Sequence, residues 1–62
     1  MNFLQYAATQ GVKMTDPLTD IVDCAIDFYE QRNPLPASDD DLPAWYERAN
    51  AFADRMADKH AL

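Results

Sequence analysis

Acidic side chains form the most distinctive pattern in the sequence. Asp16, Asp20, Asp23, Asp27 and Glu30 follow one another at intervals of four, three, four and three residues. Residues three or four positions apart lie on the same side of an α-helix. The spacing therefore predicts a row of carboxylates, which we call the acidic row, along one side of a helix.

The negative charge is confined to one part of the chain. Eight of the eleven acids lie between positions 16 and 41, where Arg32 is the only base, and the net charge of the whole chain is −6. Those outside the acidic row are the consecutive aspartates Asp39, Asp40 and Asp41. A negative surface repels nucleic-acid and membrane phosphates and attracts basic partners. We therefore predict no direct binding to nucleic acid or membranes, and a protein partner instead.

Two interpretations of the acidic row are open. In the first, it is a solvated face, because a surface helix must present polar groups to water. In the second, the acidic row and residues 39–41 together form a docking surface for a basic groove of a partner protein. Carboxylates spaced by one helical turn, about 5 to 6 Å, approximate the spacing of phosphates along a nucleic-acid strand, so such a groove could be one that otherwise holds DNA or RNA.

Residues that commonly carry catalysis are few and poorly placed. His60 is the only histidine, and its position at the end of the last expected helix disfavours a preorganised base. Cys24 has no basic sequence neighbour that would lower its pKa, so we interpret it as a small core residue. Gly11 alone cannot build a phosphate-cradling loop. We predict that the chain is not an enzyme.

Asp39, Asp40 and Asp41 resemble the start of a calcium-binding loop, but the rest of that pattern is missing. An EF-hand loop needs a central glycine and a glutamate at its twelfth position. Asn50 occupies that position when the count starts at Asp39. No cluster of cysteine and histidine offers a structural metal site either. We predict no metal and no cofactor.

The element that positions the acidic row is a helix over about residues 17–32. Asp16 is its expected N-cap, Pro17 suits the first helical position, and Pro34 ends it. Apolar residues recur with the helical period on the side opposite the acids. They are Leu18, Ile21, Val22, Ala25, Ile26, Phe28 and Tyr29.

A longer helix is expected over about residues 42–60, with Asp41 as its cap. Its apolar stripe comprises Leu42, Trp45, Tyr46, Ala49, Phe52, Ala53, Met56 and His60. We expect most of this stripe to pack in the core. The alternative is that Trp45, Tyr46, Phe52 and Met56 contact a partner or a second copy, because tryptophan and tyrosine are enriched at binding hot spots.

A short helix over about residues 3–10 is expected before this hairpin. Asn2 can cap it, and Gly11 suits the left-handed conformation that closes a helix. Leu35, in the proline-rich connection of the hairpin, is expected to plug one end of the core. Met14 offers an internal start, in which case residues 1–13 would be dispensable.

The expected fold is a single small all-α domain over residues 1–62. A domain of this size buries only about 60% of the surface of its unfolded chain, and one cysteine permits no internal disulfide. Seven aromatic residues are also much surface for three helices to cover. We therefore predict that a homodimer completes the fold. No signal-peptide or membrane-span pattern is visible, and we expect a cytoplasmic protein.

These observations favour a noncatalytic acidic protein-binding module that acts as an inhibitor or an adaptor. Small acidic chains of this kind are typical of phage and mobile-element regulators, which is an argument by analogy. The alternative is a self-associating structural component that acts through the stripe of Trp45, Tyr46, Phe52 and Met56. The first function depends strongly on salt, whereas the second depends on apolar contacts.

Overall fold

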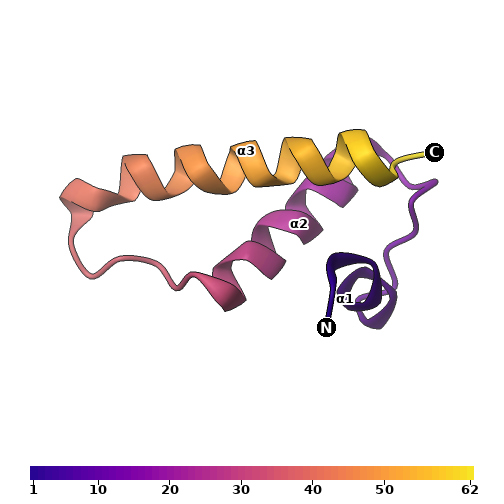
Figure 1. Cartoon of the computed structure of the whole chain (residues 1–62), viewed down its shortest axis with the longest axis horizontal. Helices are drawn as coiled ribbons and strands as arrows, with labels where there is room; N and C mark the ends of the chain where they lie inside the picture. Colours follow the sequence, from indigo (N-terminus) through magenta and orange to yellow (C-terminus); the bar gives the residue numbers. More distant parts are fainter.

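The computed structural model describes residues 1–62 and contains helices only. The elements are α1 (Phe3–Thr9), α2 (Leu18–Arg32), a 3₁₀ turn η1 (Asp39–Asp41) and α3 (Leu42–His60). Helices α2 and α3 form a hairpin, and α1 packs beside α2 (Figure 1). The predicted all-α hairpin with a short preceding helix is confirmed, and each helix bound lies within one residue of its expected position.

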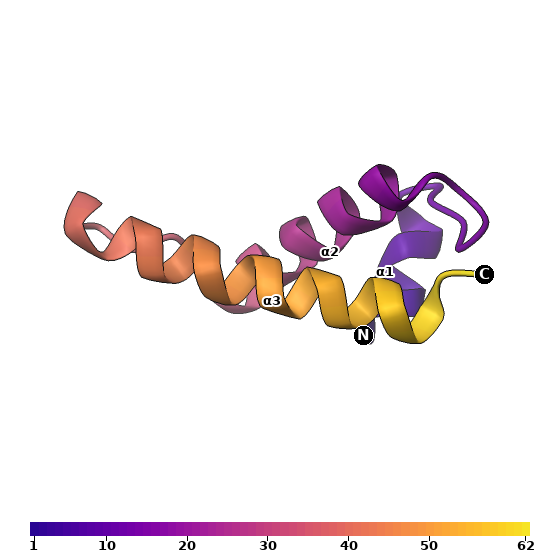
Figure 2. The same cartoon turned by 90° about the horizontal axis from the view of Figure 1, so that it is seen from above.

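The hairpin is open and oblique. Figures 1 and 2 show that α2 crosses α3 at an angle and that the first turns of α3 project beyond the end of α2. The molecule is correspondingly elongated, with extents of 36 × 19 × 14 Å. At the other end of α3, the Leu62 N–H donates a hydrogen bond to the Met14 carbonyl at 3.0 Å. This bond ties the end of the chain to the α1–α2 connection.

Both ends of α1 have the local structure that the sequence predicts. The Asn2 side chain accepts a hydrogen bond from the Gln5 N–H at 2.9 Å, and the Gln5 side chain accepts one from the Asn2 N–H at 2.8 Å. This reciprocal capping box satisfies two N–H groups at the helix start. At the other end Gly11 has φ of 73°, which a residue with a Cβ rarely adopts.

The start of α2 differs from the prediction that Asp16 is its N-cap. Pro17 occupies that position and provides no side-chain cap. The Asp16 carboxylate instead accepts a hydrogen bond from the Lys13 N–H at 3.0 Å. Because Pro17 is still extended, with ψ of 145°, the helix begins one residue later and Asp16 stabilises the preceding turn.

The start of α3 is also capped differently from the prediction. Asp41 is the N-cap residue, but its side chain makes no capping hydrogen bond. Ser38 caps the 3₁₀ turn before it, since its hydroxyl accepts from the Asp40 N–H at 3.3 Å. The side-chain cap at this end of the hairpin therefore belongs to η1 and not to α3.

The main core is organised around the ring of Phe28 on α2. Its centroid lies 6.1 Å from that of Phe3, 5.4 Å from Tyr6 and 6.2 Å from Phe52. One ring therefore joins α2 to both other helices. The nine buried members of this core are Phe3, Tyr6, Ala7, Ile21, Cys24, Ala25, Phe28, Ala53 and Ala57. Three of them come from α1, so a chain that began at Met14 would lack part of its core.

Alanine lines most of the buried side of α3. Its buried residues are Trp45, Ala49, Ala53 and Ala57, each four positions from the next. Four residues turn the helix roughly 40° beyond a full circle, so this contact line winds slowly and follows the oblique path of α2. Tyr46, which the expected stripe included, is consequently 49% exposed, whereas Ala57, which it omitted, is buried.

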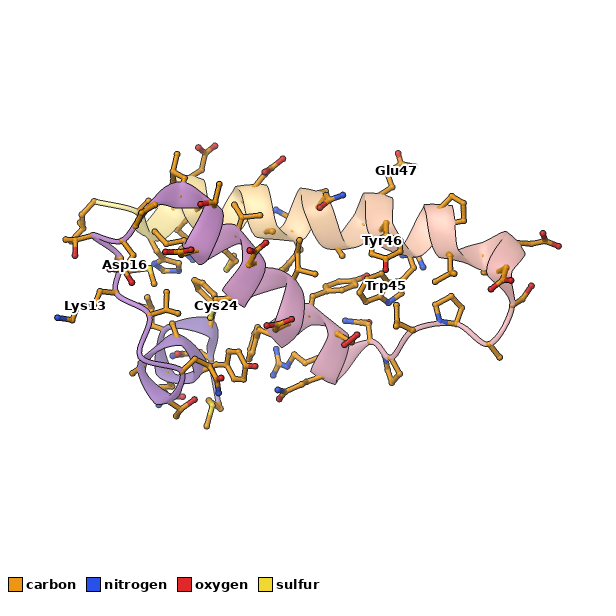
Figure 3. All side chains as sticks on the ribbon, turned by 180° about the vertical axis from the view of Figure 1, so that it is seen from behind. Lys13, Asp16, Cys24, Trp45, Tyr46 and Glu47 are labelled. Atoms are coloured by element: carbon orange, nitrogen blue, oxygen red, sulfur yellow. The ribbon has the colours of Figure 1, made fainter.

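Trp45, rather than Leu35, closes the open end of the hairpin. Leu35 is 45% exposed, so the expectation that it plugs the core is wrong, while Trp45 is only 3% exposed. The indole N–H donates to the Asn33 carbonyl at 2.7 Å, and the ring lies 5.4 Å from Tyr29 in an edge contact. Figure 3 shows Trp45 between α3 and the connection.

Most of the aromatic surface is covered within one chain. Of the seven aromatic residues, four are buried, two are half-buried, and Tyr46 is the one exposed. Of the aromatic surface that three helices were expected to leave partly uncovered, only Tyr46 is exposed in one chain. Dimerisation stays a prediction.

Replacing Phe28 with alanine should lower the free energy of unfolding by about 3–5 kcal/mol. The change removes ring contacts to both other helices and leaves a cavity, and the loss is comparable with the entire stability of a domain this small. Urea unfolding followed by circular dichroism measures the effect. Leu35→Ala is the control, because a substitution at this exposed residue should change stability by less than about 0.5 kcal/mol. Equal midpoints for the two variants would contradict the central position of Phe28.

Candidate functional site

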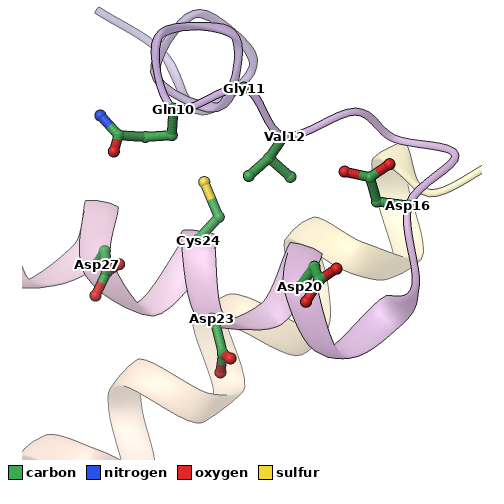
Figure 4. Close-up of a pocket in the computed structure, with 8 residues that line it drawn as sticks. All are labelled: Gln10, Gly11, Val12, Asp16, Asp20, Asp23, Cys24 and Asp27. Carbon is green, nitrogen blue, oxygen red and sulfur yellow. The ribbon is translucent and has the colours of Figure 1, made fainter.

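Most of the acidic row lines a groove beside the end of α1. This groove, which we call the acidic groove, has a volume of about 390 Å³. Its lining residues are Gln10, Gly11, Val12, Asp16, Asp20, Asp23, Cys24 and Asp27 (Figure 4). The structure thus brings together four carboxylates of the acidic row around one concave surface.

Two elements position the walls of the acidic groove. The helical period of α2 places Asp20, Asp23 and Asp27 on its exposed side, and the hydrogen bond from Lys13 holds Asp16 in the connection. The end of α1 supplies the opposite wall. There the Val12 N–H donates to the Ala7 carbonyl at 2.9 Å, so Val12 is held against the end of the helix.

Cys24 lies at the bottom of the acidic groove and is only 5% exposed. Figure 4 shows its side chain directed toward the end of α1. Burial raises the pKa of the thiol above its ordinary value of 9.0, and the negative charge of Asp27 raises it further. The thiol is therefore protonated at neutral pH and is a poor nucleophile. The prediction that Cys24 is a core residue is confirmed.

The carboxylates do not form a coordination site. No group of three or more histidine, cysteine, aspartate or glutamate side chains is arranged to hold a metal ion. Successive carboxylates on a helix are separated by about a turn, so they spread along α2 instead of converging on one point. The groove is an extended negative surface.

The remaining predicted acidic residues lie elsewhere. Glu30 continues the acidic row along α2 but is half-buried and does not line the acidic groove. Asp39, Asp40 and Asp41 form η1 at the far end of the molecule from the α1–α2 connection (Figure 1). The connection over residues 33–41 carries the chain away from α2, so the expected joint surface of the acidic row and residues 39–41 is divided in two.

The predicted apolar contact residues are largely used inside the hairpin. Trp45 is buried, and Phe52 and Met56 are half-buried and pack against the main core. Tyr46 alone is exposed, with its ring 5.1 Å from that of Trp45 in an edge contact. Of these four residues, Tyr46 therefore offers the most surface to another molecule.

A second groove, which the sequence did not reveal, runs between α2 and α3. It has a volume of about 530 Å³ and is lined by Leu18, Val22, Asp54, Ala57, Asp58 and Ala61. We call it the α2–α3 groove. Local sequence patterns did not identify the residues of this groove or the α1 wall of the acidic groove, because both surfaces depend on how the helices pack together. The positions of Leu18 and Val22 on the apolar stripe of α2 were the sequence signal for this groove.

Comparison with known proteins does not assign this chain to a family. No family model matches the chain, and neither a curated protein nor a solved structure does. None of the three helices combines the length and hydropathy that a membrane crossing requires. The structure defines a small helical hairpin with a negative groove on one side of α2 and a partly apolar groove on another.

Stability should decrease as the pH rises above about 9, because the pKa of the Cys24 thiol is raised in the folded chain above its ordinary value of 9.0. The folded state holds the thiol proton more tightly than the unfolded state does. The contribution of the thiol to the free energy of unfolding is therefore fully present below the pKa of the unfolded thiol, and it is lost as the pH rises through the pKa of the folded thiol. The pKa of Tyr6 is raised in the same direction from 10.0 by burial and by Asp27.

Urea midpoints measured from neutral to alkaline pH test this expectation. In the Cys24→Ala variant, the urea midpoint should fall less steeply as the pH rises. The fall that remains at the highest pH should become smaller still when Tyr6→Phe is added. An unchanged slope in the double variant would show that neither group is responsible. The absolute stability of each variant does not affect the test, because only its dependence on pH is compared.

Proposed function

We propose that this chain is a noncatalytic protein-binding module whose acidic groove docks on a basic surface of a partner protein, in the manner of an inhibitor or an adaptor. The observation that carries the proposal is the arrangement of Asp16, Asp20, Asp23 and Asp27 around one groove. A concave surface with four carboxylates is suited to positively charged side chains that protrude from another protein.

The electrostatics of the acidic groove support such a partner. No lysine or arginine lines the groove, so its negative field is directed at the solvent and at approaching molecules. Like charges one turn apart destabilise a helix by about 0.2–0.5 kcal/mol per pair. A basic partner removes this repulsion on binding, and the net charge of −6 accelerates its approach at low ionic strength.

The shape of the groove suits lysine or arginine side chains in particular. Val12, which is half-buried in the α1 wall of the groove, offers an apolar surface against which the methylene groups of a long side chain can pack. Carboxylates then meet the charged end, and an arginine can pair with one of them through two parallel hydrogen bonds. The exposed positions of Asp20, Asp23 and Asp27 keep the desolvation penalty of such pairs small.

A noncatalytic role is consistent with the other groups near the groove. Cys24 is protonated and covered, for the reasons given above. His60 does not line the acidic groove, and its ring lies 6.0 Å from that of Phe3.

Neutralising the acidic groove should weaken partner binding at least about tenfold, which corresponds to about 1.4 kcal/mol. The variant is Asp20→Asn, Asp23→Asn and Asp27→Asn together. Its matched control is Asp39→Asn, Asp40→Asn and Asp41→Asn, which changes the net charge equally but at the far end of the molecule. The partner is captured from lysate of the source cells, and its affinity is then measured with purified proteins at several salt concentrations.

The control should weaken binding less than about twofold and keep the salt dependence of the unmodified chain, because its charges lie at the far end of the molecule and salt screens interactions between distant exposed charges. Equal losses in the two triple variants would show that net charge alone governs binding. Affinity that does not change with salt would remove the electrostatic proposal altogether.

Self-association is the second candidate function, and the exposure of Tyr46 is the observation that favours it. This candidate predicts a dimer at high micromolar concentration and a monomer for Tyr46→Ala, as measured by sedimentation equilibrium. Tyr46 is the suitable position because it is 49% exposed, whereas Trp45 is buried and its replacement would disturb the hairpin itself. An unmodified chain that sediments as a folded monomer would eliminate this candidate.

A further inference from the structure

The α2–α3 groove is separate from the acidic groove. The two share no lining residue. Leu18 and Asp20 are two positions apart in α2, and two positions turn an α-helix by about 200°. The two grooves therefore lie on nearly opposite sides of α2, and a partner bound in one leaves the other free.

The α2–α3 groove is hollow because α3 contributes short side chains to it. Ala57 and Ala61 face Leu18 and Val22 across the groove. An alanine methyl group cannot reach across to cover a leucine, and Leu18 is accordingly 59% exposed. A leucine left open on an otherwise well-covered apolar stripe can bury its surface against a ligand at little further cost.

The polar residues of the α2–α3 groove are all acidic. Asp54 and Asp58 line it from α3 and are four positions apart, about one helical turn. The bases next to them in sequence, Arg55 and Lys59, are not among the lining residues. A ligand for this groove must therefore combine an apolar side chain with positive charge on the α3 side.

We propose that the α2–α3 groove is a second docking surface and that it binds a basic amphipathic helix of a partner protein. One apolar side chain of that helix enters between Leu18, Val22 and Ala57. Lysine or arginine residues one turn apart on the same helix match the spacing of Asp54 and Asp58. This mode of recognition, an amphipathic helix in an apolar groove, is common among protein-binding domains.

A second copy of this chain does not fit the groove. A symmetric pair that met through the α2–α3 groove would place Asp54 and Asp58 of one copy against the same residues of the other. Like charges brought together in an interface oppose binding. The inference goes beyond the proposed function, because two docking surfaces on opposite sides of α2 allow the chain to join two proteins.

The test uses a designed helical peptide as the probe, with leucine residues along one side and lysine residues on both flanks. Its binding to the full chain is measured by fluorescence anisotropy, and the contact residues are located from backbone amide shifts in NMR spectra of the ¹⁵N-labelled protein. Two groove variants are compared, Leu18→Glu and the pair Asp54→Lys with Asp58→Lys. Both alter exposed residues, so the fold is retained.

Each groove variant has a matched control elsewhere in the chain. Leu35→Glu makes the same replacement at an exposed leucine outside both grooves, and Asp39→Lys with Asp40→Lys makes the same charge change at the far end of the molecule. Each groove variant should weaken peptide binding at least about tenfold, and each control less than about twofold. The amide shifts should centre on Leu18, Val22, Ala57 and Ala61.

Three results would overturn the inference. The first is equal weakening in the groove variants and their controls. The second is the absence of amide shifts, or a set of shifts centred on the acidic groove. Shifts at the acidic groove would contradict a second docking surface and would leave the proposed function intact. The third is self-association of the unmodified chain that Leu18→Glu abolishes, which would assign the groove to a second copy.

Discussion

The contacts of one aromatic ring, Phe28, hold the three helices together. A helix of seven residues such as α1 is too short to be stable alone in water. It forms here because Phe3 and Tyr6 pack on Phe28, and the contact of Phe28 with Phe52 extends this cluster to α3. The end of α1 then forms one wall of the acidic groove. The shape of that groove consequently depends on an interaction in the core.

The alanines of α3 have two consequences for the surface. Ala49, Ala53 and Ala57 let α3 lie close to α2 over an oblique contact, and larger side chains at these positions would force the helices apart. Toward the end of α3, Ala57 and the following Ala61 leave Leu18 uncovered and create the α2–α3 groove. At the opposite end the helices diverge, and the indole of Trp45 fills the gap and bonds to the connection.

Helix α2 presents three different surfaces on three sides. Its acidic row faces the solvent and the end of α1, its main apolar side forms the core, and Leu18 and Val22 form a wall of the α2–α3 groove. Since carboxylates on one side repel each other and the leucine on another is exposed, α2 retains features that reduce its stability in isolation. Both features would be relieved by binding, which is the physical link between the two proposed docking surfaces.

The sequence by itself determined the helices, their ends to within one residue, and the alignment of Asp20, Asp23, Asp27 and Glu30 along α2. The reason is that the helical period and the local chemistry of Asn2, Gly11 and Pro17 act over a few residues. Only the tertiary structure decided that Tyr46 is exposed while Ala57 is buried, and that Trp45 takes the place expected for Leu35. It also separated residues 39–41 from the acidic row and built both grooves. A period places a side chain around one helix, whereas the crossing angle and the path of the connection decide what covers it. These depend on contacts between residues distant in sequence, which no local pattern records.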